Sequence, residues 1–272
     1  MKQIINTPPA RTFRWLGVNG TAAELPSSAE NTVCTVPAGS EQILVLPEDV
    51  SAQNITVDIE PHALFRLIQI RKDTGSDSRF SDIHVNCQEG SRFEWYRIVL
   101  GGTSYDNCSV ALSGADSSFA AEIGYRLDGQ DLLDVNCEAI HTGRRTNSTI
   151  HASGVMSGTS SKILRGTIDL KRGCKGAVGN EQEDVLLLDE TVTNRSVPVI
   201  LCSEEDVEGN HGASIGQLDE DLVFYLESRD IPREAVYEMM AKARIDAVIR
   251  KLPESVLAAE FPEYLHKEEA SI

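Results

Sequence analysis

The stretch Lys162-Ile163-Leu164-Arg165-Gly166-Thr167-Ile168-Asp169-Leu170 sets the polar residues Arg165, Thr167 and Asp169 between apolar ones. Alternation with a period of two is typical of a β-strand that buries one face. Segments of this kind, separated by Gly, Ser, Asn and Asp, recur along most of the chain. The others span residues 43–46, 55–59, 64–70, 82–87, 93–100, 108–112, 119–125, 132–139, 149–155, 185–188 and 197–202. The sequence therefore predicts a mainly β protein.

A loose repeat runs through these segments. Val85-Asn86-Cys87 returns as Val135-Asn136-Cys137, and Val110-Ala111-Leu112-Ser113-Gly114 occupies a similar place between them. Strands that return every twenty-odd residues without intervening helices favour a solenoid. A β-sandwich also has closely spaced strands, so the pattern alone leaves both architectures open.

The period changes near Gly216, where a helical pattern begins. Asp219-Glu220-Asp221 places negative charge at a helix start, and Pro232 suits the first turn of a second helix. Apolar residues then recur at helical spacing at Val236, Met240, Ala243 and Ala247. The expected division is an N-terminal extension over 1–29, a β-helix core over 30–215 and a C-terminal helical segment over 216–272.

Charge and cysteine usage narrow the range of partners. The 272 residues carry 42 acidic and 25 basic side chains, a formal net charge of -17. Such a surface disfavours nucleic acid and anionic membranes as partners. The first residues lack the apolar core of a signal peptide, and the cysteines form no CxxC pair. We therefore expect a cytoplasmic protein with six reduced thiols, at positions 34, 87, 108, 137, 174 and 202.

A motif near the C-terminus carries a family resemblance. It runs Cys202-Ser-Glu-Glu-Asp-Val-Glu-Gly-Asn-His211-Gly-Ala-Ser-Ile-Gly-Gln-Leu-Asp219 and continues as Phe224-Tyr225-Leu226-Glu227-Ser228-Arg229-Asp230-Ile231. This order of residues resembles the C-terminal signature of the SufB/SufD iron–sulfur cluster assembly proteins. Upstream, 98–102 and 165–168 also look like the core of that family.

The resemblance implies a right-handed parallel β-helix whose C-terminal helices bind SufC, an ABC-type ATPase. It also implies a non-catalytic scaffold for a transient iron–sulfur cluster, which works as a homodimer or with a SufB-like paralogue. No GxxxxGK[ST] motif occurs, so no nucleotide is expected on this chain. Two alternatives stay open: a SufD-like partner module that holds no cluster, and a β-helix carbohydrate-active enzyme.

Several positions depart from the SufB branch. Val192 stands where that branch has a functional cysteine, and Gly212 stands where it has a glutamate after the signature histidine. Glu183-Asp184 replaces an asparagine–arginine pair typical of the family. These departures, with the short length, resemble compact SufD-like members, whose functional histidine aligns with His211.

Cluster ligands are therefore sought around His211. Imidazole is a good iron ligand, and a thiolate such as that of Cys202 is the preferred ligand of iron–sulfur clusters. Without the resemblance, His211 between Asn and Gly would be a turn residue, and Cys202 would more often fill a core. Glu208 is the carboxylate of the adjacent acidic run that we expect near His211.

Two further groups of candidates lie elsewhere. Cys137 and His141 are a candidate pair for carrying sulfur along the solenoid interior. On the second predicted helix, Val236, Met239 and Met240 form an apolar stripe that we expect to dock the ATPase, because methionine suits surfaces that repack. The alternative is that the stripe packs against the body of the protein.

Overall fold

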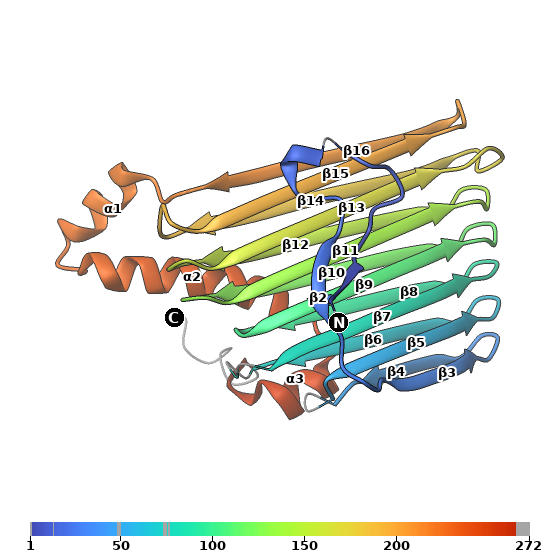
Figure 1. Ribbon diagram of the computed structural model, residues 1–272, viewed down its shortest axis with the longest axis horizontal. Helices are drawn as coiled ribbons and strands as arrows, with labels where there is room; N and C mark the ends of the chain where they lie inside the picture. The colour runs from blue at the N-terminus through green and yellow to red at the C-terminus, as the bar shows by residue number, and fades with distance from the viewer. Residues whose placement is uncertain (1, 13, 48–49, 73–74, 76, 265–272) are drawn as a thin grey trace, which may run out of the picture.

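The computed structural model describes residues 2–12, 14–47, 50–72, 75 and 77–264. Two parallel sheets of seven strands each stack as a solenoid, whose rungs rise from β3 and β4 to β15 and β16 (Figure 1). The odd sheet contains β3 (Glu30–Val36), β5 (Ala52–Ile59), β7 (Ser78–Cys87), β9 (Thr103–Leu112), β11 (Leu132–His141), β13 (Ser161–Leu170) and β15 (Thr193–Cys202). The even sheet contains β4 (Glu41–Val45), β6 (Leu64–Arg71), β8 (Arg92–Val99), β10 (Ser118–Leu127), β12 (Asn147–Met156), β14 (Ala177–Leu187) and β16 (Val207–Gly216).

The predicted parallel β-helix with C-terminal helices is confirmed, and the β-sandwich alternative is wrong. Every neighbouring pair of strands within the two sheets is parallel and in register, so equivalent residues of successive rungs form columns. Phe65, Phe93 and Phe119 form one such column, with ring centroids 5.9 and 5.4 Å apart. These columns of inward-facing apolar side chains make the core.

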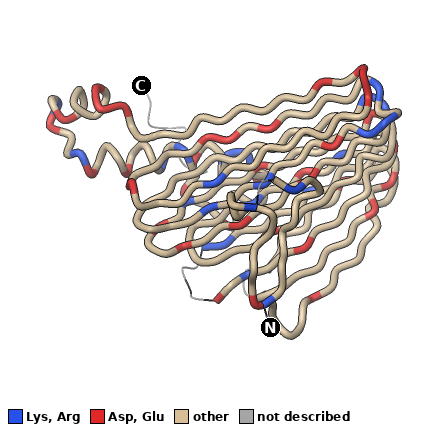
Figure 2. The backbone as a smooth tube through the Cα atoms, turned by 45° about the horizontal axis from the view of Figure 1, so that its top comes forward, with Lys and Arg blue, Asp and Glu red and all other residues tan. Residues whose placement is uncertain are grey.

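The helices lie outside the solenoid. They are α1 (Glu220–Glu227), α2 (Arg233–Ile249) and α3 (Glu254–Glu260), followed by the short 3₁₀ helix η2 (Pro262–Tyr264). The side chain of Asp219 caps α1 by accepting a hydrogen bond from the backbone N–H of Asp221, 2.9 Å away. Helix α2 packs on the outer face of β10 and β12, while α1 projects past the end of the sheets and carries several acidic residues (Figure 2). Among the described residues, no helix is long and apolar enough to cross a membrane.

An N-terminal hairpin lies across the outer face of the odd sheet (Figure 1). It is formed by β1 (Lys2–Ile5) and β2 (Thr21–Glu24), joined by a segment that includes the 3₁₀ helix η1 (Arg14–Leu16). The hairpin covers an ion pair of fully buried side chains, in which Arg165 Nη1 lies 2.5 Å from Asp134 Oδ1. Arg165 Nε donates to the backbone oxygen of Val18 at 2.6 Å, and Asn6 Nδ2 donates to Asp134 Oδ1 at 2.7 Å. The buried ion pair thus fastens the N-terminus to the solenoid.

The interior also contains a buried histidine. His141 ends β11, and its two ring nitrogens lie 2.7 Å from Thr146 Oγ1 and 2.8 Å from Ser148 Oγ. Burial lowers the pKa of His141 to about 4. The imidazole is therefore neutral at physiological pH and serves as a hydrogen-bonding part of the core.

Removing one partner of the buried ion pair should destabilise the protein. Asp134→Ala leaves the Arg165 guanidinium buried and uncompensated, so we expect the free energy of unfolding in urea to fall by roughly 3–5 kcal/mol. The hairpin should also become sensitive to limited proteolysis. Lys242→Ala is the control, because its ion pair with Asp246 lies on the surface of a helix, where such pairs contribute little and Ala is well accepted, so stability should stay nearly unchanged. Equal stability of the parent and Asp134→Ala proteins would contradict this account.

His141 should make the protein sensitive to acid. The folded state binds the proton at about pH 4 and the unfolded chain near 6.5, so this contribution to stability is complete above pH 6.5 and is lost as pH falls towards 4. The loss should reach about 3 kcal/mol in the parent protein. His141→Leu, which matches Leu112 and Leu170 in the same column, should remove this loss. Urea titrations at pH 8 and pH 4.5 measure it; an identical pH dependence in both proteins would exclude His141 as its source.

Candidate functional site

The last rung of the solenoid is open. Strands β15 and β16 are the terminal strands of the two sheets at the top of Figure 1, so each has a paired neighbour on one side only among the described residues. Most of β16 is exposed, whereas the equivalent strand one rung below, β14, has many buried positions. An exposed parallel edge is a surface on which another chain can pair.

His211 lies in the middle of β16, and its expected position in a turn is wrong. The cause is the rung below: β16 continues the register of β14, which pairs His211 with Glu181 and Asn210 with Asn180. A side-chain hydrogen bond of 3.0 Å joins the two asparagines on the outer face. Because side chains alternate along a strand, His211 points to the inner face, above Glu181.

Cys202 ends β15 and is exposed. Its Sγ donates to the backbone oxygen of Glu204 at 3.1 Å. Cys174, in the turn one rung below, is buried, and burial is the largest cause that raises the pKa of its thiol, with the neighbouring charges of Glu204 and Cys202 adding to the effect. Glu204 connects the two turns, because its side chain also accepts a hydrogen bond from the backbone N–H of Gly173 at 2.8 Å, next to Cys174.

Within one chain, the three predicted ligands are not brought together. A methyl group added at Gly209 would touch Ile200, so these two positions of β16 and β15 face each other across the last rung. His211, two residues further along β16, therefore lies near the level of Pro198 on β15. Four residues of strand separate that level from Cys202, a distance of about 13 Å. Glu208 points to the outer face of β16, on the side opposite to His211.

The sulfur-transfer pair is also separated. Cys137 and His141 are four residues apart on β11, about 13 Å along the strand. Cys137 instead pairs in register with Cys108, and burial together with the Cys137 thiol raises the pKa of Cys108 well above its usual value. Both cysteines lie in the apolar core.

A charged cluster that sequence analysis missed lies directly beneath the open rung. Lys162 of β13 forms an ion pair with Glu183 of β14, and Glu181 lies beside them, all three pointing into the solenoid. Burial raises the pKa of Glu181 to about 7 and lowers the pKa of Lys162. The Glu183 departure from the family pattern was the available signal, but the part of β14 that carries Glu181 and Glu183 is polar on both faces, and only 185–188 at its end was predicted as a strand.

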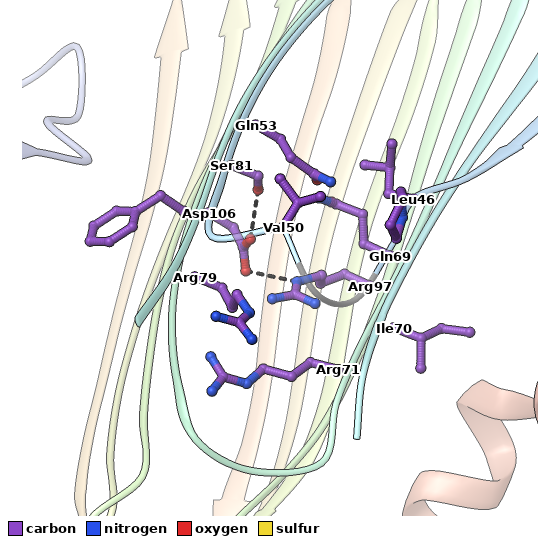
Figure 3. Close-up of a pocket in the computed structure, with 12 residues that line it drawn as sticks. Leu46, Val50, Gln53, Gln69, Ile70, Arg71, Arg79, Ser81, Arg97 and Asp106 are labelled. Carbon is purple, nitrogen blue, oxygen red and sulfur yellow. Dashed lines mark hydrogen bonds and ion pairs between the residues drawn. The ribbon is translucent and has the colours of Figure 1, made fainter. Parts of the chain in front are cut away.

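A second polar cluster lies nearer the other end of the interior (Figure 3). Arg97 Nε donates to Asp106 Oδ2 at 2.8 Å, and Ser81 Oγ donates to Asp106 Oδ1 at 2.7 Å. The pocket around these residues has a volume of only about 30 Å³, close to the share of a single water molecule. Both oxygens of the Asp106 carboxylate already accept hydrogen bonds, so this cluster is a structural network and a poor site for a ligand.

The predicted docking stripe is only partly accessible. Val236 is fully buried and Met240 packs against the cluster that α2 forms with the even sheet, whereas Met239 is 48% exposed. Helix α1 contributes larger exposed groups: Phe224 is 72% exposed and Tyr225 is 51% exposed. The guanidinium of Arg229 stacks on the Tyr225 ring at 3.7 Å. The exposed apolar groups of the helical segment are therefore those of α1 and, at a separate place, Met239, which lines a hollow with Leu100 and Phe261.

Comparison with known proteins agrees with this architecture. A family model described as the SufBD core domain of the SUF system for FeS cluster assembly matches residues 23–244. Iron-sulfur cluster assembly SufBD family proteins from Staphylococcus epidermidis and Staphylococcus aureus are each 30% identical over 168 residues, or 61% of this chain. The match spans 36% of the length of each relative. The chain is thus a member of the SufBD family, whose proteins take part in iron–sulfur cluster assembly.

Proposed function

We propose that this protein is a non-catalytic scaffold on which an iron–sulfur cluster is assembled, and that it acts with a SufC-type ABC ATPase in the cytoplasm. The observation that carries the proposal is the open last rung, where His211 and Cys202 are exposed on strands that lack a neighbour on one side among the described residues. Imidazole and thiolate are the donor types that such clusters use. Here the cluster is the cargo of the protein.

Pairing of two chains would complete the donor set. One chain offers two exposed donors, which lie on different sheets and are separated by about 13 Å along the strand direction alone, and a cluster takes about four ligands. Two copies that meet at their last rungs across a two-fold axis would bring two His211 and two Cys202 side chains to one interface. The exposed edge of β16 supports a homodimer, and a SufB-like paralogue is the alternative partner.

A second candidate is a SufD-like partner module that docks the ATPase but holds no cluster. The separation of His211, Cys202 and Glu208 within the chain favours it, as does Val192 at the position of the SufB-branch cysteine. The SufBD family accounts for the β-helix fold, so no observation favours the alternative of a carbohydrate-active enzyme.

Cluster occupancy tests the scaffold role. After anaerobic reconstitution, His211→Ala should lose most of its bound iron and sulfide, and Cys202→Ser should lose a similar share, while the unfolding midpoint stays unchanged because both side chains are exposed. Asn210→Ala is the matched control, since it lies on the same strand and faces outwards. Equal occupancy in the parent and both variants would place the cluster elsewhere. An empty parent protein would favour the SufD-like module.

Docking of the ATPase should depend on α1 and Met239. Phe224→Asp or Met239→Asp should weaken binding to the co-expressed cognate ATPase by at least about 30-fold, since an exposed anchor in an interface is commonly worth about 2 kcal/mol. Calorimetry measures the affinity. Met240→Asp serves as a contrast, because its half-buried side chain makes a loss of α2 packing the expected effect. Parental affinity in both exposed variants would remove this surface from the proposed complex.

A further inference from the structure

The carboxylate of Glu181 is incompletely satisfied. The side chain is 6% exposed, and its Oε2 atom has no hydrogen-bond partner within the part of the chain that the structure describes. Buried carboxylate oxygens are normally bonded, because removing them from water without compensation costs several kcal/mol. The only nearby cation in the described cluster, Lys162, forms its ion pair with Glu183. Glu181 is therefore available to a positive ligand.

The position of Glu181 links it to the open rung. It pairs in register with His211, and neighbouring strands lie about 4.8 Å apart, with both side chains on the inner face. The hollow of about 440 Å³ that touches both residues is lined mainly by outward-facing positions such as Gln182, so it lies on the outer face of the sheet and is not the space between the two side chains. The register alone therefore places the imidazole directly above the carboxylate at the open end of the solenoid.

Gly166 makes room for this carboxylate. Its place on β13 faces Glu181, and a methyl group there would lie 2.3 Å from Oε1. Equivalent positions on the two rungs below are occupied by Cys137 and Cys108. The column of cysteines therefore ends in a glycine at the level where Glu181 enters the interior.

We infer that Glu181 and His211 together bind a divalent first-row metal ion, which in the cell is the Fe²⁺ that enters the cluster. Carboxylate and imidazole are suitable donors for such ions. No group of three or more candidate ligands is gathered in the described residues, so the remaining coordination positions are left to water and incoming sulfide. This inference rests on the proposed scaffold function and adds a ligand to it.

Metal binding can be measured without forming a cluster. Co²⁺ serves as the spectroscopically visible probe, titrated into the full-length protein by calorimetry and by visible absorbance. We expect one site per chain in the parent protein. Glu181→Gln and His211→Ala should each weaken Co²⁺ affinity at least about tenfold. Even the loss of a residue that only hydrogen-bonds to a metal ligand commonly costs that much, so the loss of a ligand should cost no less. The double variant should bind Co²⁺ about as weakly as the more impaired single variant, because either change destroys the same site.

Two further variants separate ligation from folding. Glu208→Gln removes an exposed carboxylate from the outer face of the His211 strand and should leave Co²⁺ affinity unchanged. Glu181→Asp keeps the charge but withdraws it by one methylene, so it should also weaken binding while its urea unfolding stays close to that of the parent.

The outcomes distinguish this inference from the function on which it rests. Parental Co²⁺ affinity in Glu181→Gln would overturn the inference, and a His211-dependent cluster in that variant would leave the scaffold role intact. Co²⁺ binding that depends on both residues, in a protein that accepts no cluster, would uphold the metal site and reject the scaffold role.

Discussion

Parallel, in-register stacking of rungs is the constraint on which the rest of the structure depends. A single rung of two short strands cannot bury its inward side chains, so each rung relies on the rungs above and below it. The aromatic column of Phe65, Phe93 and Phe119 shows the arrangement in its simplest form. The same constraint explains the functional end, since the last rung has only one neighbour in the described structure and leaves His211 and Cys202 exposed.

Stacking also decided which features could be predicted from the sequence. Alternation in 162–170 indicated β13 correctly, because its neighbours are similarly amphipathic. Strand β16 and the first part of β14 carry polar residues on both faces, so only 185–188 at the end of β14 was predicted as a strand, and His211 was expected in a turn. Their conformation is imposed by pairing with β12 and β14. No local signal carries that information, and for the same reason the Glu181–His211 pairing was not visible.

Burial by segments that are distant in the sequence is a second reason why some features could not be predicted. Arg165 lies on the outer face of β13, where alternation predicts exposure to solvent, yet it is fully buried. The segment that buries it comes from Val18 and Thr21, more than 140 residues earlier. Similarly, the helical period of α2 showed an apolar stripe but not which part faces the sheet, so Val236 was expected to dock a partner and is instead core.

The connection between α1 and β16 joins the two proposed surfaces physically. Strand β16 ends at Gly216 and α1 begins at Glu220, so only three residues separate the strand that carries His211 from the helix with the exposed aromatic residues. Helix α2, by contrast, is held to the sheet by buried contacts and by the ion pair of Arg126 with Glu238. Helix α1 is itself tied to α2, because Arg233 forms ion pairs with Glu220 and Glu227, so a partner that binds α1 would contact a segment connected both to α2 and to β16. Because β16 has so little buried surface of its own, a shift of this strand would disturb few core contacts while changing the distance between His211 and Glu181.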